Sequence, residues 1–161
     1  MNYRKSVIAK KLIRYSANIY RPMLRDNGKA ALIANSVPKS GTHLLVQILE
    51  ELPDVRDFAN FIASTPSLTL KETKGSASAR RLHNLASGEL VGAHLFYSEE
   101  VRAAIKERGI LHYFIYRDPR DIIVSEVNYL TKMNRWHRLH RVLNKMDTLR
   151  EGYLFSINGD T

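Results

Sequence analysis

The chain has 161 residues, 44% of them hydrophobic, so it holds enough apolar material for one domain with a modest core. It contains no cysteine, which excludes disulfides and thiolate metal sites, and no apolar run approaches the ~20 residues needed to span a bilayer. The net charge of +9 indicates an anionic partner: a nucleotide, a nucleic acid or an acidic membrane surface.

The segment 1–28 is strongly basic, with seven Lys/Arg against one acid. Apolar side chains at close to helical spacing predict an amphipathic helix over about 3–25. Two interpretations are open: a helix that lies on an anionic membrane, or a helix packed on the domain with a solvated basic face. We favour the second because Ser16 and Asn18 interrupt the apolar face. Without a recognisable signal peptide the expected location is cytoplasmic, with peripheral membrane contact through this helix as the alternative.

A turn at residues 36–43 (Ser-Val-Pro-Lys-Ser-Gly-Thr-His) separates a predicted strand at about 29–36 from a predicted helix at about 41–51. The first turn of a helix leaves backbone N–H groups without intrahelical partners, and the helix dipole adds partial positive charge there. A strand–turn–helix unit of this kind is therefore a candidate anion site.

The side chains of this turn suit a phosphate. Gly41 lacks the Cβ that would keep an anion away, Ser40 and Thr42 add hydroxyl donors, and Lys39 supplies a full charge. In nucleoside-triphosphate loops the Lys follows the Gly, whereas here it precedes it, and no acidic residue ends a strand where it would serve Mg²⁺. A kinase or ATPase is therefore disfavoured.

Pro53 ends the predicted helix, and the residues after it carry weak signals. Residues 54–70 are mixed, with no element predicted. Residues 71–81 are polar and rich in small side chains, so we expect a mobile connection. A lid that brings basic groups over a ligand is the less favoured interpretation.

The remaining predicted elements are two strand–helix units and a basic helix: a strand at 89–95, a helix at 98–108, a strand at 110–116, a helix from 119 to about 130, and a helix at about 134–150. Six Lys/Arg lie from Lys132 to Arg150 with one acid opposing them. Residues 152–161 are expected to be an irregular tail.

Alternating strands and helices predict an α/β fold, a parallel sheet flanked by helices. Ligands of such sheets bind at the carboxyl ends of the strands. Lys39, His94 and Arg117 each follow or end a predicted strand, so we expect them to converge on one edge of the sheet.

Three stretches resemble a known family. Pro38–Thr42 resembles the 5′-phosphosulfate loop of the PAPS-dependent sulfotransferases (PAPS is 3′-phosphoadenosine 5′-phosphosulfate). Arg117–Ser125 resembles the 3′-phosphate motif of the same family, which pairs an Arg at a strand end with a Ser eight residues later. Val91–Leu95 resembles the segment that supplies the family's catalytic His. The resemblance implies a P-loop NTPase-like sulfotransferase fold.

The resemblance also implies roles for individual residues. His94 would take the proton of the acceptor hydroxyl or amine, and Lys39 would stabilise the leaving phosphate. Arg117 and Ser125 would hold the 3′-phosphate. The other residues implied to bind the 5′ phosphate, through their backbone amides, are Ser40, Gly41, Thr42 and His43. The reaction needs PAPS, a small-molecule or glycan acceptor and no metal.

The chain departs from the family in three respects. His43 and Leu44 replace the family's usual Thr-Trp, so the aromatic ring that stacks on adenine is missing there. Gly92 stands where a Lys commonly precedes the catalytic His. The resemblance covers roughly residues 30–130, the family's N-terminal half, and the later Gly-rich, basic segment has no counterpart.

We therefore expect one sulfotransferase-like domain over 29–161 that is apparently truncated, preceded by the basic helix of 1–28. Two alternatives are kept: a half-domain or fragment that binds PAPS or adenosine 3′,5′-bisphosphate without turnover, and a basic protein that binds membranes or nucleic acid. Nothing in the chain supports base-specific readout, so no specific nucleic acid is expected.

Overall fold

The computed structural model describes residues 28–66, 69 and 71–158. The helix expected over 3–25 lies outside these residues. The elements in chain order are β1 (Leu32–Ser36), α2 (Thr42–Glu50), β2 (Arg56–Ala63), α3 (Gly75–His83), β3 (Glu89–His94), α4 (Glu99–Glu107), β4 (Leu111–Ile115), α5 (Pro119–Lys132), α6 (His140–Leu143) and α7 (Leu149–Asn158).

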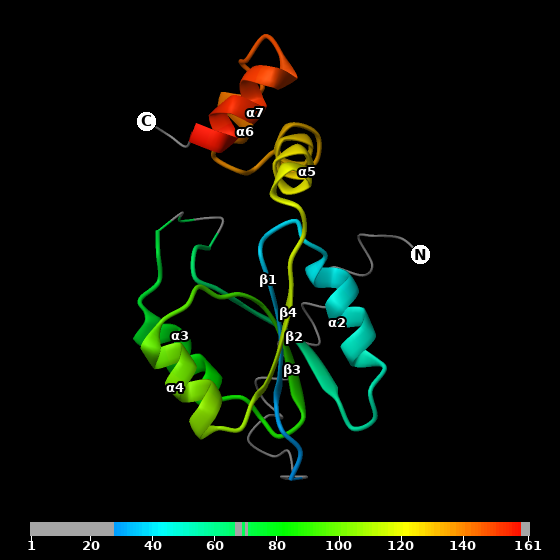
Figure 1. Cartoon of the computed structure of the whole chain (residues 1–161), viewed down its shortest axis with the longest axis vertical. Helices are drawn as coiled ribbons and strands as arrows, with labels where there is room; N and C mark the ends of the chain where they lie inside the picture. The colour runs from blue at the N-terminus through cyan, green and yellow to red at the C-terminus, as the bar shows by residue number, and fades with distance from the viewer. Residues whose placement is uncertain (1–27, 67–68, 70, 159–161) are drawn as a thin grey trace.

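The four strands form one parallel sheet in the order β2-β3-β1-β4. Helix α2 covers one face of the sheet, and α3 and α4 cover the other (Figure 1). The α/β fold class with helices flanking a parallel sheet is thereby confirmed. All four strands point their carboxyl ends toward the unit formed by α5, α6 and α7, which lies beyond that edge (Figure 1).

The alternation of side chains along β1 explains why both faces are covered. Leu32 and Ala34 pack with Leu49 of α2 on one face. Ile33, between them in sequence, points to the opposite face and joins the larger core under α3 and α4, with Leu82 and Val91. Because β1 is buried along its whole length, its carboxyl end is a rigid base for the turn that follows.

Strand β2 lies in the segment where we predicted no element. Its pairing with β3 shifts register between Asp57 and Phe61, and Ala59 in that stretch has a φ of 54°. This irregularity breaks the period-two alternation that identifies a strand from sequence. The mixed composition of residues 54–70 therefore concealed a strand at the edge of the sheet.

Helix α3 replaces the mobile connection predicted over 71–81. Its buried side chains, Ser78, Ala79 and Leu82, are mostly small, and they let α3 pack closely against α4. The guanidinium of Arg81 donates a hydrogen bond of 2.7 Å to the Phe61 carbonyl. The prediction of a mobile connection was wrong because small residues that read as a loop can instead form a helix–helix contact.

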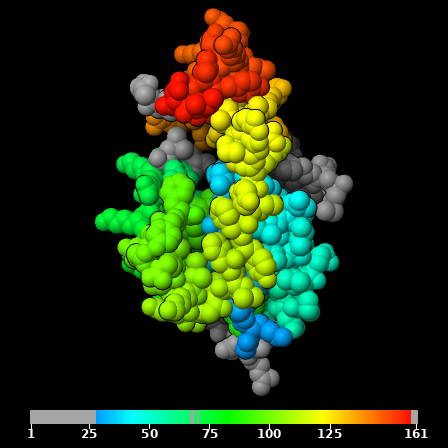
Figure 2. Space-filling model, viewed as in Figure 1, coloured from blue at the N-terminus to red at the C-terminus, as the bar shows by residue number. Residues whose placement is uncertain are grey.

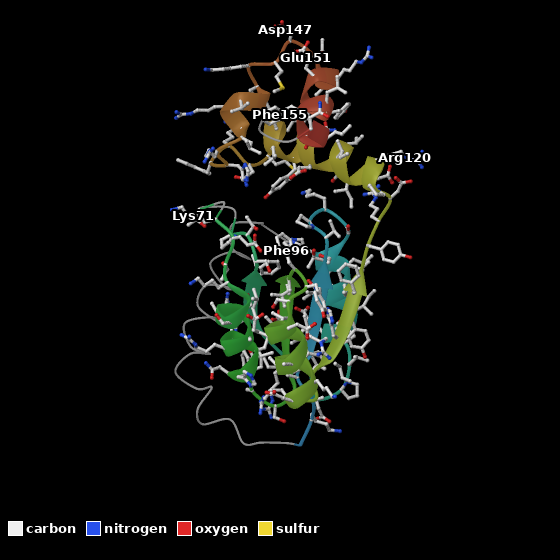
Figure 3. All side chains as sticks on the ribbon, turned by 60° about the vertical axis from the view of Figure 1, so that its left-hand side comes forward. Lys71, Phe96, Arg120, Asp147, Glu151 and Phe155 are labelled. Carbon is white, nitrogen blue, oxygen red and sulfur yellow. The ribbon has the colours of Figure 1, made fainter. Side chains whose placement is uncertain are left out.

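The predicted helix at 134–150 was also wrong, as was the irregular tail. The four residues of α6 are followed by a break, and α7 runs on to Asn158. A reciprocal cap begins α7: the Glu151 N–H donates to the Thr148 hydroxyl (3.3 Å), and the Asp147 N–H donates to the Glu151 carboxylate (3.2 Å). Thr148-x-x-Glu151 is a capping-box sequence, so this start could have been predicted. Figure 3 shows Asp147 and Glu151 at the tip farthest from the sheet.

Candidate active site at the carboxyl edge of the sheet

The turn between β1 and α2 is shaped for an anion. Lys39 and Gly41 have positive φ angles, 66° and 106°, on either side of Ser40. Helix α2 begins at Thr42, with no side-chain cap and no acidic residue in its first turn. The first hydrogen bond of α2 runs from the Leu45 N–H to the Gly41 carbonyl, 3.1 Å away. The Ser40 N–H donates to the Val37 carbonyl at 3.2 Å, which corrects the prediction that its amide is open to a phosphate. The N–H groups of Gly41, Thr42 and His43, before Leu45, are left at the start of α2 for a ligand.

The hydroxyl groups of this turn differ in their environment. The Thr42 hydroxyl is buried and hydrogen-bonds the Ser36 hydroxyl at the end of β1, so Thr42 offers a ligand its N–H rather than its side chain. The Ser40 hydroxyl is also buried, and among the described residues it has no hydrogen-bond partner. An unpaired buried hydroxyl costs about 1–3 kcal/mol, which an anion oxygen on the turn would relieve. This orphaned donor fits a bound phosphate.

Lys39 reaches from the turn to α5. Its ammonium nitrogen lies 3.4 Å from the centre of the Tyr129 ring, a cation–π contact. Burial lowers the pKa of Lys39 below its ordinary value, and the nearby Glu126 carboxylate opposes that shift. A non-glycine residue with positive φ is strained by roughly 1–3 kcal/mol, and such strain concentrates at functional sites. Lys39 thus has a strained backbone and a partly desolvated ammonium group, which lies between the turn and Tyr129 of α5.

His94, the last residue of β3, is oriented by the end of β1. Its Nδ1 lies 2.9 Å from the Ser36 carbonyl oxygen and 3.2 Å from the Ser36 hydroxyl. A carbonyl oxygen can only accept, so Nδ1 carries the proton and Nε2 has the lone pair of the neutral ring. Nε2 makes no hydrogen bond to any residue that the structure describes. The Phe61 ring packs edge-on against the imidazole, with 4.9 Å between centroids.

The protonation of His94 follows from its surroundings. Burial lowers the pKa of His94 below its ordinary value, the hydrogen bond to the Ser36 carbonyl opposes this, and the charges of His43 and Lys39 lower it further. His43 and Lys39, which come from the turn before α2, are therefore close enough to His94 for their charges to lower its pKa. Near pH 7 the ring is neutral and can accept a proton.

Gly92, the departure from the family pattern, has a packing reason. A Cβ built at Gly92 would lie 3.0 Å from the Phe61 ring, the same ring that contacts His94. A Lys at this position would displace that ring. The space beside His94 is thus filled by an aromatic side chain from β2 in place of a cation.

The second motif lies on the exposed edge of the sheet. Arg117 follows β4, and its guanidinium donates two hydrogen bonds to the Asp121 carboxylate, at 3.0 and 3.1 Å. Both side chains are about half exposed. Asp118 caps α5 by accepting a bond of 2.9 Å from the Arg120 N–H, and Pro119 takes the first helical position, where the helix was predicted to begin.

Ser125 lies on α5 one turn before Tyr129, so both share the helix face that meets Lys39. Lys39 and His43 lie close enough to His94 for their charges to act on it, and Lys39 contacts Tyr129, one turn from Ser125. Arg117 follows β4 at the same carboxyl edge of the sheet, with its guanidinium bonded to Asp121.

Sequence reasoning missed three side chains that shape the site: Ser36, Phe61 and Tyr129. Ser36 was noted only as the beginning of the turn. Tyr129 had one usable signal, its i+4 spacing from Ser125 on a helix. Phe61 had none, because β2 itself was not predicted. Among the described residues, no group of three or more His, Asp or Glu is arranged to hold a metal ion.

Comparisons with known proteins give the family of this chain. A family model described as "Sulfotransferase domain" matches residues 29–156. Among solved structures, that of mouse sulfotransferase SULT7A1 complexed with PAP is similar, with a TM-score of 0.50 and 23% identity. The similar region covers 84% of this chain and 43% of the mouse chain, so this chain spans less than half the length of that protein. No curated protein matches the sequence.

Proposed function

This chain belongs to the sulfotransferase domain family, and we propose that it transfers the sulfuryl group of PAPS to a hydroxyl or amine acceptor. The observation that carries the proposal is the orientation of His94: its Nδ1–H is bonded to the Ser36 carbonyl, and its Nε2 is left for a substrate beside the phosphate turn. A neutral imidazole next to an anion cradle supplies both a base and a place for the leaving group.

His94 is proposed as the general base. Nε2 takes the proton of the acceptor hydroxyl or amine as the acceptor atom bonds to sulfur and the bond from sulfur to the 5′-phosphate oxygen breaks. The Ser36 carbonyl then stabilises the imidazolium, because Nδ1–H already points at it. The lowered pKa of His94 keeps the ring neutral before the reaction.

Lys39 and the turn are proposed to receive the leaving phosphate. Negative charge grows on the phosphate oxygen as the bond to sulfur breaks, and a cation nearby in a partly desolvated site stabilises it. The Lys39 ammonium, now over the Tyr129 ring, is the nearest full charge of the turn. The N–H groups from Gly41 to His43 and the unpaired Ser40 hydroxyl, at the start of α2, would bind the other oxygens.

Arg117 and Ser125 are proposed to hold the 3′-phosphate of the donor. An Arg guanidinium forms two parallel hydrogen bonds with a phosphate as readily as with a carboxylate, so Asp121 is a stand-in for the anion that Arg117 would bind. A site that requires this phosphate discriminates PAPS from ATP, which lacks it.

A second candidate function is a module that binds PAPS or adenosine 3′,5′-bisphosphate without turnover. It is favoured by the phosphate turn and the Arg117 guanidinium, which would bind the phosphates of either nucleotide whether or not His94 takes a proton.

The test measures binding and turnover separately. Calorimetry should give tighter binding of adenosine 3′,5′-bisphosphate than of ADP, and equal affinities would contradict the proposed nucleotide site. Transfer of labelled sulfate from PAPS to a panel of hydroxyl and amine acceptors should then be abolished by Lys39→Ala and by His94→Ala. Binding with no transfer to any acceptor supports the module, and unchanged transfer by both variants refutes the assigned roles.

A further inference from the structure

The connection between α5 and α6 presents the most exposed aromatic side chain of the described residues. The Trp136 indole is 95% exposed, and Met133, which ends α5, is 75% exposed. Single exposed apolar residues are ordinary on protein surfaces, but tryptophan is one of the side chains that water disfavours most. Both residues lie between α5 and α6, in the helical unit beyond the carboxyl edge of the sheet (Figure 1).

The backbone that carries Trp136 is held in place. The Met133 and Asn134 N–H groups both donate to the Tyr129 carbonyl at 2.9 Å, and the His137 N–H donates to the Asn134 carbonyl at 3.2 Å. The His140 Nδ1 lies 2.6 Å from the Leu130 carbonyl oxygen, which ties α6 back to α5. Trp136 is therefore at the tip of a braced turn, pointing outward.

The segment that carries this tip is basic. Between Lys132 and Met146 there are five Lys/Arg and no acidic residue. Arg135, Arg141 and Lys145 are exposed and form no ion pair with any residue that the structure describes. We call this set, Met133, Arg135, Trp136, Arg141 and Lys145, the Trp136 surface.

We propose that the Trp136 surface binds the anionic face of a phospholipid bilayer. An indole with an apolar body and a polar N–H is suited to the headgroup boundary, and Met133 adds apolar area beside it. Each Lys/Arg close to an anionic leaflet strengthens binding by roughly fivefold. A single-stranded nucleic acid would use several stacking rings, and the described residues offer one here.

The inference does not rest on the proposed sulfotransferase activity, nor on the basic segment 1–28. Contact of the Trp136 surface with a vesicle can be measured by fluorescence, because the chain contains a single tryptophan. The emission of that residue reports the environment of the Trp136 surface and of no other part of the chain.

The test uses the full chain with phosphatidylcholine vesicles, with and without phosphatidylserine. Vesicles that contain phosphatidylserine should shift the tryptophan emission to the blue, brominated acyl chains should quench it, and salt should reverse both effects. Cosedimentation with vesicles whose tryptophan emission stays unchanged would overturn the proposal, because another part of the chain would then make the contact. A shift caused by single-stranded RNA and absent with the vesicles would overturn it as well.

Matched charge variants sharpen the test. Arg135→Gln with Arg141→Gln should weaken vesicle affinity roughly 25-fold, from about fivefold for each charge. Arg80→Gln with Lys106→Gln removes the same charge from exposed sites on α3 and α4 and should leave affinity unchanged. Equal weakening by both pairs would mean attraction by net charge alone and would refute a defined surface.

Discussion

Strands β3 and β4 pair with the same central strand, β1, from its two sides, yet they lie in opposite environments. Leu90 of β3 and Leu111 of β4 are both in register with Leu32. Leu90 is 0% exposed and Leu111 is 49% exposed. In Figure 2, β4 runs along the front surface between α4 and α2. An apolar β-rich sequence therefore does not by itself produce a buried strand.

The contrast extends to the two halves of the proposed site. His94 at the end of β3 is fixed by a carbonyl of β1 and by the Phe61 ring, so its position depends on core packing. Arg117 after β4 is held by an exposed ion pair with Asp121. We expect substitutions near His94 to lower the free energy of unfolding as well as activity. Substitutions near Arg117 should change the affinity for the nucleotide with little effect on stability.

The largest expected effect is the loss of activity on substitution of His94, at the buried end of β3. His94→Ala should lower kcat by about 10²–10⁴-fold, the usual contribution of a general base. His83→Gln is a matched control, because His83 is an exposed histidine on α3. Sulfate transfer measured alongside circular dichroism checks the prediction. Equal losses in the two variants would remove the special role of His94.

Substitutions of Leu90 and Leu111 test whether β3 is buried and β4 exposed in solution. Leu90→Ala should destabilise the fold by roughly 2–5 kcal/mol, because a fully buried leucine leaves a cavity. Leu111→Ala should destabilise it by about 1 kcal/mol or less, since half of that side chain already meets water. Chemical denaturation of both variants measures the difference. Comparable destabilisation would mean that β4 is covered in solution.

Substitution of Arg117, which follows the exposed strand β4, should change the relative affinity for the two nucleotides. Arg117→Ala should weaken adenosine 3′,5′-bisphosphate binding by about 10–100-fold, from the roughly 1.5–3 kcal/mol of hydrogen bonds to a charged group, and leave ADP binding unchanged. Arg120→Ala is the control, because Arg120 is 90% exposed and bonded to Asp118. Calorimetry gives the affinities. A similar loss for ADP would argue against a 3′-phosphate contact.

Acid should abolish the proposed sulfate transfer through protonation of His94. Because burial lowers the pKa of His94, the rate should stay constant down to pH values below the ordinary His pKa of about 6.5 and then fall tenfold per pH unit. The sign for stability is the same: below the ordinary His pKa of about 6.5 the unfolded chain binds the proton and the folded chain does not, so stability falls from there until the pH reaches the lowered pKa of folded His94. The pH dependence of kcat/KM checks this. An acid limb centred above 6.5 would contradict it.

The smallest expected effect is a gain. Asp121→Asn removes the carboxylate that Arg117 must leave to bind a phosphate. Exposed ion pairs contribute about 0.2–1 kcal/mol, so affinity for adenosine 3′,5′-bisphosphate should rise by up to about fivefold. A titration of the variant against the parent protein measures it. Weaker binding would show that Asp121 orients Arg117 instead of competing for it.

Local sequence determined the parts of the site that depend on neighbouring residues. The turn from Pro38 to Thr42 needs a glycine at its positive φ and free N–H groups at the start of α2, and both follow from residues in contact along the chain. The Asp118–Pro119 start of α5 was predictable for the same reason. The family resemblance of these stretches rests on that local chemistry.

The tertiary structure alone decided the rest. The His94 proton is assigned by a carbonyl 58 residues earlier in the chain. Tyr129 reaches Lys39 only because α5 crosses the edge of the sheet above the turn. β2 became a strand despite its irregular pattern because β3 offered it a ladder of hydrogen bonds, and β4 stayed exposed despite its apolar pattern because no described element covers it. The apolar pattern of a segment indicates which side chains could be buried. Whether they are buried depends on which other elements pack against that segment.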